Sequence, residues 1–244
     1  MRGRSKLSQL SVLLALTIFA MLPTMKAIAA CPDGIRAYWK LDGSGPEYVD
    51  FIGGNNGNND GGPPNDPNPE DGAQRFNGID QGIDVPASSA FNWAGSESFS
   101  IELWVKGPTD VPPAGVANNQ VIVGRNGTVM QWFVGVANAT GNLVFRLIDA
   151  DGNSAAINDG PVLSEDRWYH VVAVVTESDF ETTVDVSLFV DNALAGTSAT
   201  DQDLSGGFSS ASAPLQLGYL DDGFFFNGAL DEVVFYDRAL TSNE

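Results

Sequence analysis

The sequence predicts an all-β fold, built as a two-sheet antiparallel β-sandwich or jelly roll. Apolar and polar residues alternate with a period of two along many short segments, as in SFSIELWVKG at residues 98–107. Glycine, proline, asparagine and aspartate separate these segments at short, regular intervals. A long run with the 3.6-residue apolar period of a helix is absent from the sequence. This spacing favours a sandwich over a parallel α/β sheet.

Each predicted strand is rich in Val, Ile, Phe, Trp or Tyr and is bounded by turn-forming residues. The predicted strands are residues 35–42, 81–85, 98–107, 119–126, 130–137, 143–149, 167–176, 184–191, 214–220 and 229–237. Between the first two lies GGNNGNNDGGPPNDPNPEDG, residues 53–72, which contains no large apolar side chain. We expect a long surface loop there, either a flexible insertion or a loop whose oxygen atoms bind a ligand or cation.

Residues 1–30 have the pattern of a secretory signal peptide. A basic MRGRSK start precedes an apolar run at residues 11–22, and small residues end the segment at Ala30. The apolar run is too short to span a membrane. We therefore predict an exported protein whose single domain comprises residues 31–244, enough chain for one sizeable core.

Cys31, at the predicted cleavage site, also fits the pattern of a lipid-anchored bacterial protein. Lys26 interrupts the approach to that site, and the strand pattern resumes at Ile35 without a tether, so ordinary export is favoured over a lipid anchor at Cys31. Cys31 is the only cysteine, which excludes a disulfide within the chain and leaves a free or intermolecular thiol.

The chain is strongly acidic, with 12 basic and 31 acidic residues and a formal net charge of −19. Such a surface repels nucleic acid and anionic membranes, so neither is expected as a partner. Two roles of these carboxylates are compatible with each other: they can keep the protein soluble in a salty medium, and a few of them can bind cations.

Eight motifs occur in an order that resembles the laminin-G-like jelly-roll domains of the concanavalin A-like lectin/glucanase superfamily. They are AYWKLDGSG (37–45), YVDFIGGNNG (48–57), RFNGIDQGIDVP (75–86), FSIELWVK (99–106), DRWYHVVAVV (166–175), VSLFVDNALAG (186–196), LQLGY (215–219) and FNGALDEVVFYDRAL (226–240). The resemblance covers nearly all of residues 35–244. It implies a concanavalin A-like sandwich whose first and last strands are adjacent.

The tripeptide Phe-Asn-Gly occurs twice, at residues 76–78 and 226–228, which suggests two strands that meet in space. In the closing strand we expect Leu230 and Val234 to share one face, and Asp231 to aim its carboxylate at a loop from the strand end. Closure by this strand would cover an otherwise exposed sheet edge.

The family resemblance also implies one structural calcium ion (Ca2+). Its expected ligands are Asp50, Asp231 and the backbone carbonyl of Asn77 or Gly78, with Asn55 or Asn58 as substitutes because the loop after Asp50 is long. Carboxylate, amide and carbonyl oxygens are the ligands that calcium prefers. The alternative is that Asp50 caps a turn and Asp231 bonds a loop backbone.

Catalysis is not expected, although the superfamily includes glycoside hydrolases. Glu177, Asp179 and Glu181 spell E-x-D-x-E, similar to the signature of retaining glucanases, and on a strand they would share one face. The motif lies where the family places a hairpin connection, so solvated acids are the simpler interpretation. His170 is the only histidine and, together with one cysteine, cannot supply a zinc site.

Five tryptophans invite a sugar-stacking hypothesis, but most lie within strands, so core packing is the default expectation. Trp93, in the loop-like SAFNWAGSES, is the best candidate for exposure. The leading functional hypothesis is a secreted or cell-surface recognition module that binds an extracellular glycan or a surface protein and is stabilised by calcium. The alternatives are a divergent glycoside hydrolase using Glu177, Asp179 and Glu181, and a structural adhesive module of a cell-surface assembly.

Overall fold

The computed structural model describes a β-sandwich. The described residues are 32–58, 67–94, 97–107, 119–127, 130–165, 167–177, 184–200, 204, 206–221 and 223–244. The predicted signal segment, Cys31, Asp179 and Glu181 lie outside these ranges. The described part of the chain contains no helix long and apolar enough to cross a membrane.

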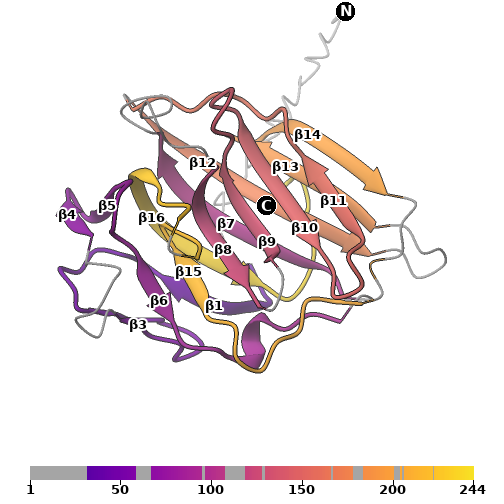
Figure 1. Cartoon of the computed structure of the whole chain (residues 1–244), viewed down its shortest axis with the longest axis horizontal. Helices are drawn as coiled ribbons and strands as arrows, with labels where there is room; N and C mark the ends of the chain where they lie inside the picture. The colour runs from indigo at the N-terminus through magenta and orange to yellow at the C-terminus, as the bar shows by residue number, and fades with distance from the viewer. Residues whose placement is uncertain are drawn as a thin grey trace, which may run out of the picture. The chain divides into compact units, whose positions relative to one another are not determined.

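Two antiparallel sheets form the sandwich, and Figure 1 shows them as two layers. The first sheet runs in the order β14 (Ala193–Thr200), β13 (Val184–Val190), β12 (Trp168–Glu177), β7 (Phe99–Lys106), β16 (Asn227–Tyr236), β5 (Ala73–Asn77) and β4 (Asn68–Glu70), with β1 (Ile35–Trp39) also paired to β16. The second runs in the order β11 (Ser154–Ile157), β10 (Leu143–Ile148), β9 (Met130–Val136), β8 (Gln120–Asn126), β15 (Leu215–Leu217), β6 (Ile83–Val85), β3 (Gly57–Asn58) and β2 (Glu47–Tyr48).

All ten predicted strands are present, with ends that differ by a few residues. The alternation of apolar and polar residues did not predict β5, β11 and β14 or the very short β2, β3 and β4. The described part of the predicted loop at residues 53–72 contributes β3, which lies between β6 and β2, and β4, which forms an edge of the first sheet.

The closing strand β16 occupies the position that the resemblance implies. It pairs with β1 through Trp39 opposite Val233, and with β5 through Asn77 opposite Asn227. The two Phe-Asn-Gly copies therefore lie on paired strands, which confirms that these corners meet. Along one edge, β16 therefore pairs with both β1 and β5, and along its other edge it pairs with β7.

One detail of β16 corrects the predicted alternation. Leu230, Val233 and Phe235 pack in the main core, whereas Val234 packs in a separate cluster. The register with β7 shifts between Asp231 and Val234, which marks a bulge, and a bulge changes the face on which later residues lie. Leu230 and Val234 consequently do not share a face.

The core between the sheets is aromatic. The Trp93 ring stacks on Phe99 with centroids 3.9 Å apart and an interplanar angle of 8°, and Phe235 and Trp132 lie within 6.2 Å of it. Trp93 is 1% exposed, so the prediction that it is the exposed tryptophan is wrong. It follows the short 3-10 helix Ser89–Phe91, whose connection turns inward and places the indole in the core.

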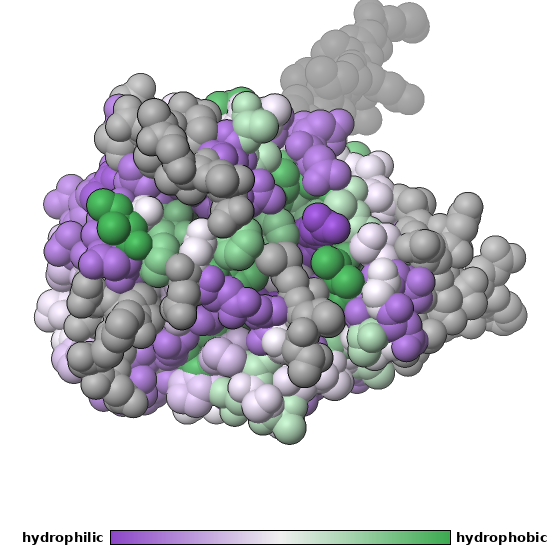
Figure 2. All heavy atoms as spheres, in the orientation of Figure 1, coloured by the Kyte–Doolittle hydropathy of each residue, from purple (hydrophilic) through white to green (hydrophobic). Residues whose placement is uncertain are grey.

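Figure 2 views the molecule in the orientation of Figure 1, and hydrophilic residues surround a smaller green area near the middle of this side. On the second sheet, Val121, Phe133, Val144 and Leu220 form a cluster apart from the main core, with Phe224 packed against it. Of the aromatic run 224–226, Phe226 is fully buried in the main core and Phe225 stacks on Tyr219. The run is therefore used mainly for packing.

Candidate functional site

The outer face of the first sheet, which is turned away from the second sheet, carries the candidate site. Along β7, Leu103 and Val105 are fully buried in the core. Glu102 and Trp104 therefore point outward, because successive strand residues alternate between the two faces. Trp104 is 40% exposed, which is unusual for a side chain of this size.

A depression of about 280 Å³ on this face is lined by Trp104, Trp168, Asp231 and Glu232, and we call it the tryptophan depression. Its residues come from the adjacent strands β7, β12 and β16. The register places Asp231 directly opposite Trp104, and opposite residues share a face. Two indole rings and two carboxylates thus border the same hollow.

The bulge in β16 explains why two consecutive acids reach the depression. Glu232 has a φ of 50°, a left-handed conformation that is uncommon for residues other than glycine. Val233, the next residue, returns to the fully buried core. The bulge therefore leaves both Asp231 and Glu232 beside the depression instead of sending one of them inward.

The electrostatics of the depression are dominated by the acids. Burial raises the pKa of Asp231 to about 6, with further contributions from the charges of Glu232 and Asp42. The Lys106 ammonium lies 5.4 Å from the ring centre of Trp168 and is paired with Glu70 at 3.6 Å. Asp231 therefore releases its proton at a higher pH than an ordinary aspartate, and protonation lowers the local repulsion.

We expect Asp231→Asn to stabilise the fold by about 1 kcal/mol at pH 8, and to have almost no effect near pH 4. The folded pKa of Asp231 exceeds the unfolded value, so the ionised carboxylate costs stability above about pH 6, and this cost vanishes as the pH falls toward 4. The magnitude is reduced from the full value of a two-unit shift because the side chain is partly exposed. Urea unfolding in EDTA at both pH values measures it; an equal effect at both would contradict the assignment.

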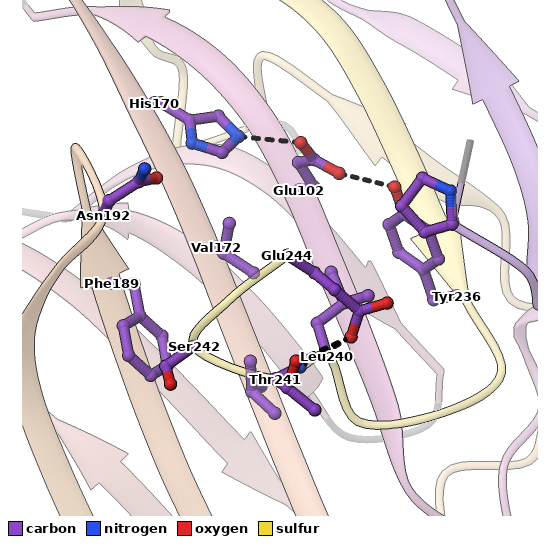
Figure 3. A pocket seen from close by; sticks show the side chains of 12 residues that line it. Glu102, His170, Val172, Phe189, Asn192, Tyr236, Leu240, Thr241, Ser242 and Glu244 are labelled. Carbon is purple, nitrogen blue, oxygen red and sulfur yellow. Dashed lines mark hydrogen bonds and ion pairs between the residues drawn. The ribbon is translucent and has the colours of Figure 1, made fainter. Parts of the chain in front are cut away.

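Beside the depression lies a pocket of about 180 Å³ under the C-terminal segment, which we call the tail pocket. Figure 3 shows Glu102 between His170 and Tyr236 at its polar side. The Glu102 carboxylate lies 2.7 Å from His170 Nε2 and accepts a hydrogen bond of 2.5 Å from the Tyr236 hydroxyl. Burial acts to raise the pKa of Glu102, but these partners outweigh it and hold the pKa below its ordinary value.

The two hollows are neighbours on the same strands. Glu102 and Trp104 are two positions apart on β7, about 7 Å along the strand. The ring of His170 lies 5.1 Å from the ring of Trp104 and also bonds Glu102. The isolated histidine of the sequence is therefore a half-buried outer-face residue that separates the tryptophan depression from the tail pocket.

Asp50, predicted as a calcium ligand, has all its acceptor capacity used by the chain. Its Oδ1 accepts hydrogen bonds from the backbone N–H groups of Tyr38, Ile52 and Gly53 at 2.9, 3.0 and 3.0 Å. Its Oδ2 accepts from the backbone and side-chain nitrogens of Asn55, both at 2.9 Å. Burial acts to raise the pKa of Asp50, but the backbone hydrogen bonds outweigh it and lower the pKa.

We expect Asp50→Ala to destabilise the fold by about 2 kcal/mol at neutral pH, because it leaves five part-buried N–H donors without their acceptor. The stability that wild-type Asp50 contributes is present above the unfolded pKa and is lost as the pH falls through the lowered folded pKa. Urea unfolding of Asp50→Ala and of the exposed control Asp185→Ala tests this. Equal midpoints for the two variants would contradict the role of Asp50.

Asn77 and Gly78 form a tight corner between β5 and the next loop. Asn77 Oδ1 accepts hydrogen bonds from the backbone N–H groups of Ile79 and Asp80 at 2.9 and 3.2 Å. Gly78 has a φ of 72°, and a Cβ there would lie 2.7 Å from that of Asn227. This corner therefore requires glycine for conformation and space.

The predicted calcium ligands thus lie in three different settings. Within the described ranges, no group of three or more His, Cys, Asp or Glu residues is arranged to hold a metal ion. The five hydrogen bonds to Asp50 fit a turn cap and do not fit a calcium ligand. Asn55 serves Asp50, and Asn58 lies on β3. Asp231, which accepts a 3.0 Å hydrogen bond from the N–H of Glu232, keeps oxygens at the depression; calcium binding stays a prediction.

Glu177 is the one member of the E-x-D-x-E motif within the described part. It ends β12 and pairs with Val184 at the start of β13. β12 and β13 are antiparallel neighbours, and the residues between them, including Asp179 and Glu181, lie outside the described ranges.

Trp104 is the functional candidate that the sequence analysis missed. The signal was present in FSIELWVK, where Ile101, Leu103 and Val105 occupy alternate positions. That alternation puts Trp104 on the polar face together with Glu102. Treating every strand tryptophan as a core residue overlooked this period.

Comparisons with known proteins agree with this fold. A family model described as "Concanavalin A-like lectin/glucanases superfamily" matches residues 77–244. A search of the curated proteins finds no match for the sequence.

Similar solved structures include three of different origin. The binding domain of Paraclostridial Mosquitocidal Protein 1 has a TM-score of 0.66 and 18% identity, over 86% of this chain and 50% of that one. Domain 4 of AbnA, a GH43 extracellular arabinanase from Geobacillus stearothermophilus, has a TM-score of 0.59 and 20% identity, over 86% and 95%. Trypanosoma rangeli sialidase has a TM-score of 0.57 and 14% identity, over 87% and 32%.

These structural likenesses are at low identity and concern the fold, and the chain spans about half the length of the first structure. The family model is more specific, because it covers more than half of the sequence and includes β7, β12 and β16 of the candidate site. The chain belongs to the concanavalin A-like lectin/glucanase superfamily.

Proposed function

We propose that this protein is a secreted, non-catalytic module that binds an extracellular carbohydrate on the outer face of its first sheet. The observation that carries the proposal is the tryptophan depression, where exposed Trp104 lies beside Trp168 and opposite the carboxylates of Asp231 and Glu232. Secretion is part of the proposal and is supported by the signal pattern of residues 1–30.

The chemistry of the depression suits a sugar ring. An indole offers a large, rigid apolar surface, against which the C–H face of a sugar can pack. Ionised carboxylates accept hydrogen bonds, and the hydroxyl groups of a sugar donate them. A few convergent polar groups beside an aromatic surface are the usual composition of a small-molecule site.

Structural neighbours support the same class of ligand. One of them, domain 4 of the arabinanase, was solved with arabinotriose, and another, the binding domain of Botulinum Neurotoxin DC, with SialylT. The second of these has 15% identity to this chain. The likeness supports a carbohydrate-binding role and does not specify the sugar.

A surface protein is the second candidate ligand, and a separate observation favours it. Val49, Phe51 and Ile52 are each 45–57% exposed in one turn. The Phe51 ring lies 6.1 Å from that of Tyr38, and the Lys40 ammonium lies 5.2 Å from the Phe51 centroid. Neighbouring exposed apolar side chains with a cation are typical of protein contacts.

The deciding experiment is a glycan array probed with the purified chain in calcium and again in EDTA. We expect a defined class of glycans to bind, and Trp104→Ala to weaken that binding strongly. A folded protein that binds no glycan in either buffer would refute the carbohydrate proposal and favour a protein ligand through the Val49–Ile52 turn.

Calcium remains a proposal that rests on the family resemblance, with Asp231 as its most accessible ligand. Millimolar calcium is expected to raise the melting temperature of the wild type above its value in EDTA. Asp231→Asn should abolish that rise, whereas Asp185→Asn should preserve it, because the loss of a carboxylate ligand removes the stabilisation by binding. Equal melting temperatures of the wild type in both buffers would argue against a bound calcium.

A further inference from the structure

The tail pocket is a built cavity on the same face as the tryptophan depression. Its apolar floor comes from β12, β13 and the C-terminal segment, and its polar side comes from β7, β12 and the β13–β14 turn. The floor residues are Val172, Val174, Phe189 and Leu240, and the polar ones include Glu102, His170 and Asn192. Figure 3 shows Asn192, His170 and Glu102 along one side, with Val172 next to them. On the other side it shows Phe189 and Leu240 together with the polar Thr241, Ser242 and Glu244.

The wall formed by the C-terminal segment is held in place by specific hydrogen bonds. Ser100 Oγ on β7 donates to the carbonyl of Arg238 and accepts from the N–H of Leu240, both at 2.9 Å. The Arg238 guanidinium in turn pairs with Glu244 at 2.5 Å. The pocket is therefore a fixed part of the fold, and its shape is largely formed before a ligand binds.

The volume of the pocket limits what can enter. About 180 Å³ corresponds to roughly six water molecules at about 30 Å³ each. This is smaller than a typical drug-sized site. The pocket accordingly suits one substituent of a larger ligand whose main contact is elsewhere on the face.

The hydrogen-bonding groups are matched to a small amide. Each oxygen of the Glu102 carboxylate accepts one hydrogen bond, from His170 or from Tyr236, and retains a further lone pair for an N–H donor. Asn192, exposed in the β13–β14 turn, carries an amide that can donate to a carbonyl. The apolar floor between them would contact a methyl group, whereas a hydroxyl there would lose its hydration without a partner.

The charge of the site disfavours an anionic substituent. Glu102 lies in the tail pocket, and Asp231 and Glu232 lie in the adjoining depression. Glu244 also lines the tail pocket, and it is paired with Arg238. Lys106, which lies over the Trp168 ring, is paired with Glu70 at 3.6 Å. A carboxylate or sulfate in the tail pocket would therefore meet the like charges of these acids.

We propose that the tail pocket is a second subsite of the binding face and takes the acetamido group of an uncharged N-acetylated sugar whose ring stacks at Trp104. The amide N–H is donated to Glu102, the amide carbonyl accepts from Asn192, and the methyl group packs on Val172 and Phe189. The inference rests on the proposed carbohydrate-binding function and adds a ligand class to it.

The test is an array of matched glycan pairs that differ only by an acetamido or a hydroxyl group at C2, such as N-acetylglucosamine against glucose termini. The best pair is then titrated by calorimetry against the full chain. We expect the acetamido member to bind about tenfold or more tightly, which equals about 1.4 kcal/mol. Sialylated glycans should bind more weakly than their uncharged parents.

Two variants test whether the tail pocket causes the preference for the acetamido member. Asn192 has a φ of 63°, so Asn192→Gly removes the amide while suiting the backbone. It should reduce the preference for the acetamido member to about threefold or less and leave the affinity for the hydroxyl member within about twofold. Val172→Phe, which fills the pocket, should do the same by occupying the methyl position. Val162→Ala, at an exposed position that lines neither hollow, is the matched control and should change neither affinity.

The outcomes separate the two proposals. Equal binding of both members of every pair, or a preference that survives in both Asn192→Gly and Val172→Phe, overturns the subsite and leaves carbohydrate binding intact. A folded wild-type protein that binds neither member of any pair, nor any other glycan on the array, overturns the proposed function and the subsite with it.

Discussion

Arg125→Ala is expected to lower the free energy of unfolding by about 3–5 kcal/mol, the largest effect of any single substitution considered for this fold. Arg125 is fully buried on β8 of the second sheet. Its guanidinium donates to the carbonyl of Phe91, to those of Phe208 and Ser210 at 3.1 and 3.0 Å, and to that of Ala213 at 3.4 Å.

The size of this effect follows from what the truncation leaves behind. Four carbonyl groups lose a charge-assisted donor, and the removed side chain leaves a cavity. Burial lowers the pKa of Arg125 to about 10, so the guanidinium is still charged at neutral pH. The dipoles of the four carbonyl groups stabilise this buried charge. The same side chain joins the segment before Trp93 to the segment at residues 208–213, since one of its nitrogens donates to both Phe91 and Phe208.

Urea unfolding at pH 7 measures this prediction. Arg125→Lys should recover only part of the loss, because an ammonium cannot reproduce the planar fork of five donors. The control is Arg146→Ala at an exposed position on β10, which should stay within about 0.5 kcal/mol of the wild type. A similar loss in Arg125→Ala and Arg146→Ala would show that the four carbonyl contacts contribute little.

Trp104→Ala is expected to weaken glycan binding by about 30-fold, equivalent to about 2 kcal/mol, while the protein stays folded. The indole is the broadest apolar surface of the depression, and its removal takes away the stacking platform while Asp231 and Glu232 remain. Because 40% of the side chain is exposed, its removal from the free protein should cost only about 1 kcal/mol of stability or less.

Calorimetric titration with the best glycan of the array, together with thermal unfolding of each variant, checks this second prediction. Trp104→Phe retains a smaller aromatic face and should keep part of the affinity. Val162→Ala removes an exposed apolar side chain that lines neither hollow and should bind as the wild type does. Undiminished affinity of Trp104→Ala would place the sugar elsewhere on the molecule.

Much of the fold could be predicted from the alternation along single segments. The pattern in residues 98–107 correctly indicated a strand with one face in the core, since burial on one face imposes a period of two. The repeated Phe-Asn-Gly tripeptide indicated a contact between β5 and β16 because both copies occupy equivalent corners of paired strands. The very short strands β2, β3 and β4 escaped prediction because few of their side chains are buried.

The candidate site was harder to predict because it depends on side chains brought together from different strands. The sequence pointed to Asp50 as a structurally important residue. An aspartate that binds a cation, however, cannot be distinguished by sequence from one that caps a turn. The distinction lies in the N–H groups of Tyr38, Ile52 and Gly53, which converge on Asp50 only after β1 pairs with the segment that follows β2.

The sequence by itself determined the sandwich class, the positions of the main strands and the acidic surface, because these depend on local periodicity and composition. Only the tertiary structure decided which tryptophan is exposed and which acids lie beside it. Trp93 enters the core through a connection without regular alternation, whereas the β16 bulge turns Asp231 and Glu232 toward Trp104. Both outcomes depend on cross-strand register and non-local packing, for which a local pattern carries no information.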